Sequence, residues 1–369
     1  MFNYPTKKLG EVLEKNGVIP AKIKRDDYRQ SGKYPVVDQG ENLIAGYIDD
    51  ERKLYRGDLP VVIFGDHTRI IKFIDFPFAF GADGIKILRP QKILLPKFFY
   101  YTLILNPVAN QGYKRHFSFL VQTRIPLPPL EIQKQIVERL DKIAEAQKLN
   151  DDLIQKSDEL FQSLLHKELN PSGKTWGTKK LKEICEINPS KAEIRKMSEC
   201  TVVSFLAMAD VSENAEILNR QERKLGEVKN GFTFFKNDDV LVAKITPCFE
   251  NGKGAFVENM VNGVGFGSTE FHVLRANREL LLNKLLYYVV SDKKFRKAGA
   301  KFLTGSAGQQ RVPTYYLENF KIPLPALGAQ KQIVAKLSAV QDYKTQLLAQ
   351  KSKLKELFNS VLSKSFSGK

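Results

Sequence analysis

The chain has few of the residues that build disulfide frameworks or metal centres. It holds three cysteines, an odd number without a Cys-x-x-Cys pair, and only four histidines. We therefore expect Cys185, Cys200 and Cys248 to be reduced, buried thiols of a cytoplasmic protein, with no metal site. No run of about 18 apolar residues is present, so no membrane span is expected. The first residues also lack the apolar stretch of a signal peptide.

What the chain has in excess is positive charge. Lysine and arginine number 58 against 41 acidic residues, which gives a net charge of +17 over 369 residues. Residues 1–170 carry 26 basic and 22 acidic side chains (+4), and residues 171–369 carry the remaining 32 and 19 (+13). A protein this basic often meets a polyanion, most commonly nucleic acid. A generally basic surface without such a partner is the alternative.

One stretch of the sequence occurs twice. Residues 125–140 and 322–337 are identical at 11 of 16 positions without a gap, 197 residues apart. Both copies begin Ile-Pro-Leu-Pro and continue into Gln-Lys-Gln-Ile-Val. Earlier matches have shorter offsets, 172 near Thr6 and 187 near Lys97, so insertions gather ahead of this motif. The chain is thus two copies of one design, each a variable domain followed by a rigid element.

The rigid element is predicted to be a long helix. Proline stands just ahead of each copy, and in the first copy none follows until Pro171. Apolar residues recur close to a 3.5-residue period, which is typical of a coiled-coil seam. Residues 130–167 would make a helix about 57 Å long. The predicted seam residues are Ile136, Leu140, Ile143, Ile154, Phe161 and Leu164, and then Ile333, Leu337, Val340, Leu347, Leu354, Phe358 and Val361.

The two helices are predicted to pair with each other, antiparallel, with the domains at opposite ends. Residues 130–167 hold 6 basic and 8 acidic side chains (−2), whereas residues 327–364 hold 7 and 2 (+5). Opposite net charges favour this pairing over self-pairing of either helix. The alternative is that each helix packs only on its own domain, or that the seam meets a foreign helix.

The variable domains are predicted to be mixed α/β (α+β), and two domains suit a chain of this length. Strands are expected at residues 59–64, 84–88, 240–245 and 271–274, where β-rich runs lie between Gly/Asp/Asn turns, with helices at 94–105 and 279–290. The predicted boundaries are 1–124 for the first variable domain, 125–169 for the central helix, 170–176 for a linker, 177–321 for the second variable domain and 322–369 for the C-terminal helix.

These features resemble the specificity subunit of type I DNA restriction–modification enzymes. The resemblance rests on the order of variable domain and helix, repeated over nearly the whole chain, and on the doubled helix start led by Ile-Pro-Leu-Pro. It rests also on the loops at residues 64–69, 80–84, 244–254 and 267–271, which look like parts of two different target-recognition domains.

The resemblance implies a DNA reader without catalytic activity of its own. Each target-recognition domain would read one half of a bipartite site in double-stranded DNA, and the helices would set the spacer. Two methyltransferase subunits, and in the nuclease form two restriction subunits, would assemble on it, and a methylation-only system would use the same scaffold. S-adenosylmethionine, ATP and Mg²⁺ would bind to those partners, and the modified base would be adenine, one on each strand. The chain departs from the family at Ile132 and Ala329, where Glu is frequent, so a helix contact to a partner differs there.

The residues predicted to contact DNA are polar or basic side chains of these loops. Arginine paired with guanine, and Asn or Gln paired with adenine, are the commonest base contacts. For each single residue a purely structural role in a turn is the alternative. The predicted set is Lys22, Lys24 and Arg25 on phosphates, Asp66, His67, Thr68, Arg69, Lys114, Arg115 and His116 in the first domain, and Lys244, Thr246, Asn251, Lys253, Ser268, Thr269, Gln309, Gln310 and Arg311 in the second.

Other chemistries have weaker support in the sequence. His67 beside Asp66 has no further ligand or second acid at a suitable spacing. Residues 173–175 (Gly-Lys-Thr) lack the earlier glycine of a phosphate loop, because Glu168 occupies its place. We therefore expect no catalytic residue and no cofactor in this chain. Two rival functions are a single-chain nuclease or methyltransferase with duplicated DNA-binding lobes, and a coiled-coil adaptor for acidic proteins.

Overall fold

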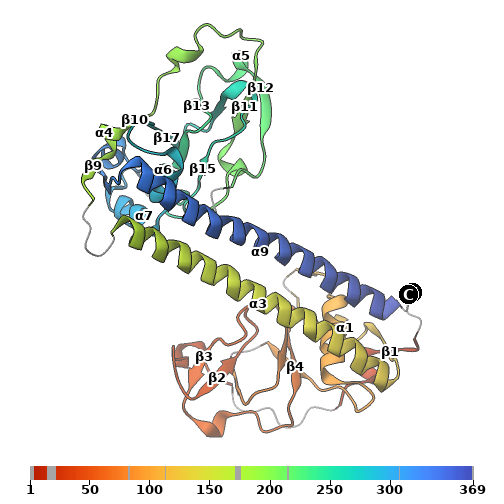
Figure 1. Cartoon of the computed structure of the whole chain (residues 1–369). Helices are drawn as coiled ribbons and strands as arrows, with labels where there is room; N and C mark the ends of the chain where they lie inside the picture. Colours follow the sequence, from red (N-terminus) through yellow and green to blue (C-terminus); the bar gives the residue numbers. More distant parts are fainter. Residues whose placement is uncertain are drawn as a thin grey trace. The chain divides into compact units, whose positions relative to one another are not determined.

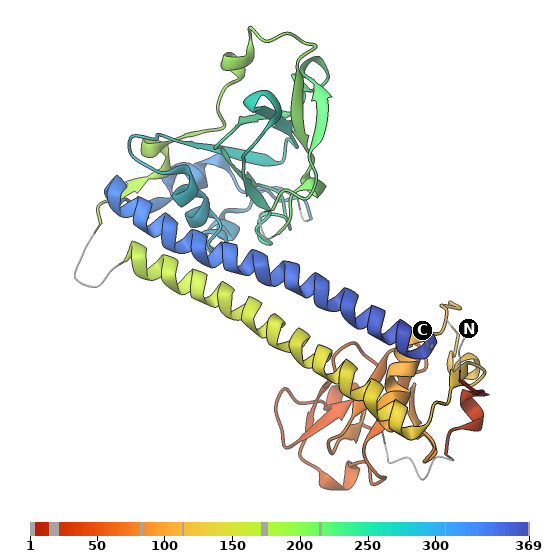
Figure 2. The ribbon, with the colours of Figure 1, turned by 45° about the vertical axis from the view of Figure 1, so that its right-hand side comes forward.

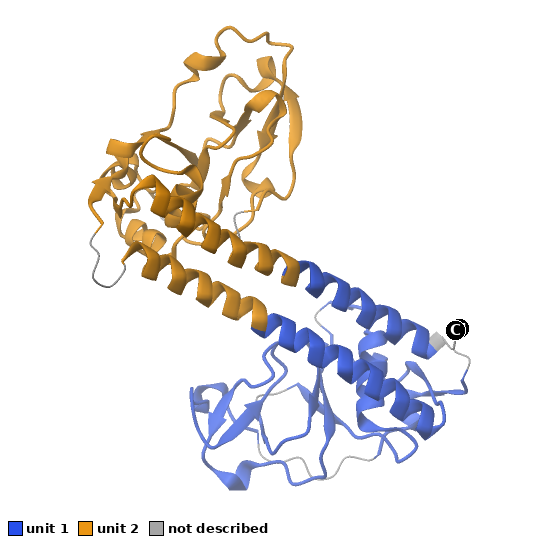
Figure 3. Cartoon of the chain, in the orientation of Figure 1, with its two compact units in different colours: residues 1–152, 348–369 blue, residues 153–347 orange. Residues whose placement is uncertain are grey.

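The computed structural model divides into two compact units (Figures 1 and 3). Unit 1 is Met1–Asp152 together with Leu348–Lys369, and unit 2 is Leu153–Leu347. Most of the predicted linker, residues 171–175, lies outside the described residues, as do residues 82 and 83 of a predicted DNA-contacting loop. Within the described part, no helix is both long and apolar enough for a membrane crossing. The structure describes residues 4–14, 22–81, 84–112, 114–170, 176–213, 216–306 and 308–367.

In its described residues, unit 1 contains two three-stranded sheets and a two-stranded ribbon. One sheet has the order β5-β4-β7 and is antiparallel, and the other has the order β3-β2-β6, with β2 and β6 parallel. The ribbon pairs β1 with β8, just ahead of the long helix α3. The bounds are β1 (Thr6–Lys8), β2 (Tyr34–Val37), β3 (Gly46–Ile48), β4 (Val61–Gly65), β5 (Ile71–Ile74), β6 (Ala79–Phe80), β7 (Ile85–Leu88), β8 (Arg124–Pro126), α1 (Pro96–Leu105), α2 (Phe117–Leu120), α3 (Leu130–Leu169) and the 3-10 turns η1 (Leu9–Glu11), η2 (Arg25–Asp27) and η3 (Glu51–Lys53).

The part of unit 2 that the structure describes contains two four-stranded sheets and a second ribbon. The sheet orders are β10-β17-β14-β15, which is antiparallel, and β12-β11-β16-β13, in which β11 and β16 are parallel. The ribbon pairs β9 with β18, just ahead of the long helix α9. The bounds are β9 (Thr178–Lys180), β10 (Cys185–Ile187), β11 (Val202–Leu206), β12 (Gln221–Lys224), β13 (Thr233–Lys236), β14 (Val240–Ala243), β15 (Gly254–Phe256), β16 (Val264–Gly267), β17 (Phe271–Ala276), β18 (Lys321–Pro323), α4 (Leu181–Ile184), α5 (Leu225–Val228), α6 (Asn283–Val290), α7 (Lys293–Gly299), α8 (Thr314–Asn319), α9 (Leu327–Ser367) and the 3-10 turns η4 (Lys191–Ile194), η5 (Met208–Asp210), η6 (Val261–Gly263) and η7 (Ala300–Phe302).

The two units repeat one topology. The ribbon β1–β8 corresponds to β9–β18, the parallel pair β2–β6 to β11–β16, and the sheet β5-β4-β7 to β15-β14-β17. Unit 2 adds β10 and β13 at sheet edges. The mixed α/β class and the internal repeat predicted from the sequence are therefore confirmed. The predicted helix at residues 94–105 begins only at Pro96, because proline is tolerated in the first turn of a helix.

A buried glutamine fixes the start of α3 to the first domain. Gln133 has no exposed surface. Its Oε1 accepts a hydrogen bond from Leu95 N at 2.8 Å, and its Nε2 donates to Ile93 O at 2.9 Å and to Pro128 O at 2.8 Å. The side chain thus satisfies the first residues of α1 and the turn that leads into α3. Buried polar groups without such partners are costly, so the three bonds hold α1 and α3 in one arrangement.

The second copy of the motif makes the same three bonds. Gln330 is also fully buried. Its Oε1 accepts from Leu282 N at 2.9 Å, and its Nε2 donates to Leu280 O and to Pro325 O, each at 2.8 Å. One residue type therefore performs one structural task at equivalent positions of both units.

The core of unit 1 takes residues from both long helices. Ile136 and Leu140 near the start of α3 and Leu362 and Phe366 near the end of α9 are buried in the cluster that surrounds α1. The ring of Phe366 stacks on Phe98 of α1, with ring centroids 5.1 Å apart. Several residues predicted for the helix seam thus also pack into the domain.

The core of unit 2 contains the start of α9 and the end of α3, the reverse of the arrangement in unit 1. Ile333 and Leu337 near the start of α9, and Phe161 and Leu165 near the end of α3, are buried in its main cluster. Phe161 meets the ring of Tyr288 in α6 edge to face, with centroids 5.2 Å apart. Each unit is therefore completed by the helix that starts in the other half of the sequence.

Within each unit the helix segments run antiparallel, side by side in both views (Figures 1 and 2). Rising residue numbers in α3 meet falling numbers in α9, and each ion pair joins an acid of α3 to a lysine of α9. The charges of the two helices predicted this pairing. Each of these ion pairs has at least one partner that is half exposed, and such pairs contribute only about 0–1 kcal/mol each, so they select the partner while the buried cores supply the stability. The contacts are Gln147 Nε2 to Leu354 O (3.2 Å) and Asp151–Lys351 (2.8 Å) in unit 1, and Asp158–Lys344 (2.6 Å) and Glu168–Lys336 (2.6 Å) in unit 2.

The three cysteines are free thiols, but they are not all buried. Cys185 and Cys248 are half-buried and Cys200 is exposed. The prediction of a buried thiol is therefore wrong for Cys200, which lies in an exposed turn where its N–H bonds to Ser198 Oγ at 3.3 Å. Burial raises the pKa of the Cys185 thiol to about 12, so it stays protonated at neutral pH.

We expect Gln133→Ala and Gln330→Ala each to lower the free energy of unfolding by about 2–4 kcal/mol, since each leaves buried backbone groups unpaired. Urea denaturation measures the loss, and hydrogen exchange locates it in α1 for the first variant and in α6 for the second. Gln155→Ala is the matched control on α3, because its side chain only reaches Glu159 on the exposed surface, at 2.9 Å. A loss at Gln133 no larger than at Gln155 would contradict the anchoring role.

Candidate nucleic-acid interface

In unit 1, two of the predicted DNA-contacting segments lie against each other. Residues 66–69 form the turn between β4 and β5, where Arg69 has a left-handed backbone with φ 63°. Arg69 Nη1 donates to Val108 O at 3.2 Å, and His116 N donates to the carbonyl of Asp66 at 2.9 Å. The fold therefore brings the β4–β5 turn and the loop ahead of α2 into one cluster.

Asp66 and His116 lie inside this cluster. The two residues are 3% and 0% exposed. His116 Nδ1 is 3.0 Å from Asp66 O, and Asp66 Oδ1 accepts from Phe117 N at 2.8 Å. These bonds fasten the turn to α2 and leave neither side chain open to a base. We correct the predicted set accordingly and assign both residues a structural role.

The exposed members of the cluster are His67, Thr68, Lys114 and Arg115. Arg69 is half-buried, and Thr68 Oγ1 donates to the carbonyl of Gln39 at 2.6 Å. The remaining predicted residues of this unit, Lys22, Lys24 and Arg25, are exposed on the segment that leads into η2.

Sequence reasoning missed two residues beside this turn. Gln39, after β2, accepts from His67 N through its Oε1 at 3.3 Å. Lys86 of β7 lies 4.0 Å from Asp66 Oδ2 and 5.4 Å from the ring centre of Phe117. Neither residue belongs to a glycine-rich motif, so nothing in the sequence pointed to them. Their position beside the turn becomes visible only once β2, β4 and β7 are placed in their sheets.

In unit 2, three predicted segments meet through backbone hydrogen bonds. Lys244 N donates to Glu270 O, and Val312 N donates to Lys244 O, both at 2.8 Å. Thr246 N donates to Gln310 O at 2.8 Å. Residues far apart in the sequence thus form one cluster at the end of β14, as the end of β4 does in unit 1.

Arg311 lies partly exposed in this cluster, and its guanidinium group bonds to two neighbouring residues. Its Nε and Nη2 donate to the two carboxylate oxygens of Glu270 at 2.9 and 2.8 Å, and its Nη1 donates to Gln309 O at 3.0 Å. The forked contact lowers the pKa of the Glu270 carboxyl below its ordinary value. Of the five guanidinium N–H groups, two remain for a ligand, and 42% of the side chain is exposed.

Three predicted residues of unit 2 have internal partners or face inward. Lys253 Nζ donates to Met208 O at 3.3 Å, and Asn251 Nδ2 donates to Glu213 Oε1 at 2.7 Å. Thr246 Oγ1 is buried and has no hydrogen-bond partner. The Thr246 hydroxyl is thus covered by protein atoms, while the residue as a whole is half-buried, and its contact with DNA stays a prediction.

The neighbouring side chains complete the edge of this cluster. Thr269 and Gln309 are exposed, whereas Ser268 Oγ accepts from Glu270 N at 3.2 Å. His272, which the sequence placed only in a strand, is buried, and burial lowers its pKa below the ordinary value. Its neutral ring bonds through Nε2 to Val312 O at 2.9 Å, which ties β17 to the segment that carries Arg311.

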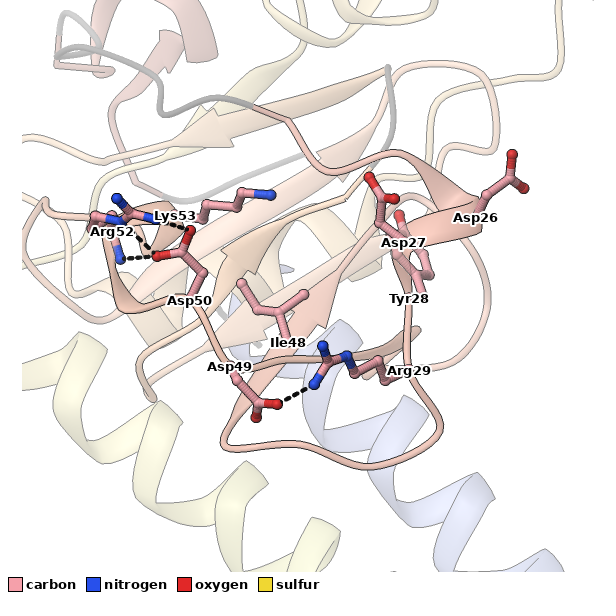
Figure 4. A pocket seen from close by; sticks show the side chains of 9 residues that line it. All are labelled: Asp26, Asp27, Tyr28, Arg29, Ile48, Asp49, Asp50, Arg52 and Lys53. Carbon is pink, nitrogen blue, oxygen red and sulfur yellow. Dashed lines mark hydrogen bonds and ion pairs between the residues drawn. The ribbon is translucent and has the colours of Figure 1, made fainter.

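A separate hollow in unit 1 gathers acidic residues between η2 and η3 (Figure 4). Its cavity volume is about 750 Å³. Asp49 pairs with Arg29, and Asp50 pairs with Arg52 at 2.9 Å, so half of its four aspartates are neutralised by neighbouring arginines. Among the described residues, no group of three or more His, Cys, Asp or Glu side chains is arranged to hold a metal ion. This hollow therefore gives no support for metal chemistry.

The chain matches known proteins over most of its length. A family model described as "Type I restriction modification DNA specificity domain" matches residues 2–156 and 173–356, once for each half of the internal repeat. The specificity subunit of type I restriction enzyme EcoAI from Escherichia coli is 38% identical over 178 residues, 48% of this chain and 29% of that protein. The EcoEI specificity subunit from Escherichia coli is 41% identical over 170 residues, 46% of this chain and 28% of that protein. The match thus spans less than a third of the length of either relative.

A solved structure has a similar fold. The S subunit of a type I restriction–modification system from M. genitalium aligns with 99% of this chain and 96% of its own length, at a TM-score of 0.62 and 15% sequence identity. At this identity the likeness concerns the fold alone, whereas the family model covers both repeats of the sequence. The chain belongs to the family of type I restriction–modification DNA specificity domains.

Proposed function

We propose that this chain is the DNA-specificity subunit of a type I restriction–modification system and reads a bipartite site in double-stranded DNA. Each unit reads one half of the site through its loop cluster. The observation that carries this proposal is that one repeated frame bears two unlike clusters of polar side chains. The two units share one topology, but their exposed loops carry different side chains. This is the arrangement expected of two DNA-recognition domains with different target sequences.

The chemistry of the two clusters suits base recognition in different ways. The unit 2 cluster offers Arg311, whose free N–H groups match the two acceptors of guanine in the major groove. The unit 1 cluster offers Thr68 and His67 with two basic residues, Lys114 and Arg115. The net charge of +17 supplies sequence-independent attraction to phosphates, which is strongly weakened by salt.

The partners in this proposal carry out the chemistry. Two methyltransferase subunits and, where the system restricts DNA, two restriction subunits assemble on the chain in the cytoplasm. S-adenosylmethionine, ATP and Mg²⁺ bind to those subunits, and adenine is methylated on each strand. The internal repeat supports this assembly, because a duplicated surface offers the same contact to two copies of one partner. The chain itself contributes recognition and no catalytic residue.

The paired helices act as the spacer between the two readers in this proposal. α3 and α9 contain 40 and 41 residues, and each contributes to the cores of both units. A helix that is anchored at its start and buried at its end has little freedom to change length. The number of base pairs between the half-sites is therefore fixed by helix length.

We predict that Arg311→Ala reduces discrimination at one position of the half-site read by unit 2 by about 1–3 kcal/mol and leaves the other half-site unchanged. Competition binding with singly substituted duplexes measures this. Arg311→Lys keeps the positive charge but lacks the planar guanidinium group that makes two parallel hydrogen bonds. It should therefore keep the attraction to phosphates and lose the preference for guanine. Arg278→Ala is the matched control, since Arg278 pairs with Asp238 on the same unit at 2.5 Å. Equal losses at both half-sites, or none, would contradict the assignment.

We predict that lengthening both helices lengthens the recognised spacer. Four residues inserted between Asp152 and Leu153 and four between Ala349 and Gln350 leave the ion pairs Asp151–Lys351 and Asp158–Lys344 matched on either side of the insertions. Each helix grows by about 6 Å, which corresponds to one or two base pairs of DNA at about 3.4 Å each. Selection of bound duplexes with varied spacers measures the change. An unchanged spacer would refute the role of the helices, and insertion in one helix alone serves as the mismatched control.

A further inference from the structure

A buried lysine closes the loop between β2 and β3 in unit 1. Lys72 lies on β5, and its side chain is only 4% exposed. Its ammonium group donates to the carbonyl of Asp38 at 2.8 Å and also to the carbonyl of Asn42. The Asp38 carboxylate is 3.7 Å away. Loop residues 38–42 are therefore wrapped around one ammonium group.

A buried ammonium group lowers the stability of the fold unless hydrogen bonds and an opposite charge compensate for its lost hydration. Burial lowers the pKa of Lys72, and the nearby Asp38 opposes that effect. A buried charge is tolerated when hydrogen bonds and an opposite charge replace the water that it loses. Here the donors of one side chain satisfy carbonyl groups four residues apart, and this fixes the curvature of the loop. An apolar residue at this position would leave both carbonyls without a partner.

The closed loop adjoins the predicted DNA-contacting turn. The hydroxyl of Thr68 donates to Gln39 O at 2.6 Å, and His67 N donates to Gln39 Oε1 at 3.3 Å. A Cβ atom built on Gly84 would lie 2.7 Å from the amide of Gln39, so the loop packs closely there. Loop 38–45 and the turn at residues 66–69 therefore form one continuous surface.

The tip of this loop is open to solvent. Glu41, Asn42 and Leu43 are exposed, and Leu43 is exposed by 47%. Asn42 carries an amide, the side-chain group that forms paired hydrogen bonds with adenine. A rigid backbone with exposed amide and apolar side chains is suited to base edges and to the methyl group of thymine.

In unit 2 a lysine also contacts the segment that follows the equivalent strand. β11 of unit 2 corresponds to β2 of unit 1, because β11 pairs in parallel with β16 as β2 pairs in parallel with β6. The segment after β11 is held by Lys253, whose Nζ donates to Met208 O at 3.3 Å. Lys253 precedes β15, the counterpart of β5, at a position that does not align with Lys72. Lys253 is half-buried and makes this one bond to a single carbonyl, so its contact is weaker than that of the buried Lys72, which bonds two carbonyls.

We propose that loop 38–45 is a further base-reading segment of unit 1, and that Lys72 is the positioning residue that holds it in its reading conformation. This inference rests on the proposed function and adds a segment that the glycine-rich motifs did not reveal. Lys72 does not touch DNA itself. Asn42 presents its exposed amide to the bases, whereas Gln39 joins the loop to the turn at residues 66–69.

The test compares base discrimination at each position of both half-sites, with the full chain co-expressed with its methyltransferase partners. Lys72→Met keeps the length of the side chain and removes the ammonium group. We expect it to reduce discrimination by about tenfold at one or more positions of the unit 1 half-site, because an open loop no longer presents Asn42 to a fixed base pair. The unit 2 half-site should be unchanged.

Two further variants separate positioning from general loss of structure. Asn42→Ala alters only an exposed side chain and should lose discrimination at a single base pair while thermal unfolding stays unchanged. Lys92→Met removes an exposed lysine of the same unit and should leave every preference unchanged. A folded Lys72→Met chain with normal preferences, or Asn42→Ala with none altered, would overturn the inference alone. A wild-type chain without two half-sites would instead overturn the proposed function, and the inference with it.

Discussion

The hydrogen bonds of one buried glutamine in each repeat hold the remaining structure in place. Gln133 and Gln330 each bond the first turn of a domain helix and the turn into a long helix. Without these bonds, the direction in which each long helix leaves its domain would be set only by apolar packing, which is not directional. With them, the turn into each long helix is bonded to the start of α1 in unit 1 and of α6 in unit 2. The repeated motif of the sequence is therefore conserved between the two halves for a geometric reason.

The cores show why two repeats are needed in one chain. Phe161 and Leu165 of α3 are buried in unit 2, and Leu362 and Phe366 of α9 are buried in unit 1. Each domain therefore lacks part of its core unless the helix that begins in the other half reaches it. The ion pairs between acids of α3 and lysines of α9 favour this exchange over pairing of identical helices.

Much of the frame could be predicted from the sequence, but only part of the site. The repeat and the 3.5-residue period predicted the helices, because periodic burial leaves a regular pattern in the residues. Asp66 and His116 were predicted as DNA contacts and are buried, since a polar residue in a loop has the same signature whether it bonds outward or inward. Gln39 and Lys72 gave no signal, because their roles depend on which strands become neighbours in the sheets.

The measurement that tests this account most directly is a selection of bound sequences from random DNA duplexes with the wild-type chain, at about 0.15 M salt to suppress binding to phosphates alone. The account predicts two short, different half-sites separated by a constant number of base pairs, with the chain alone or with its methyltransferase partners. Recovery of a single site, of two sites at variable spacing, or of no consensus from a folded chain with those partners would contradict it.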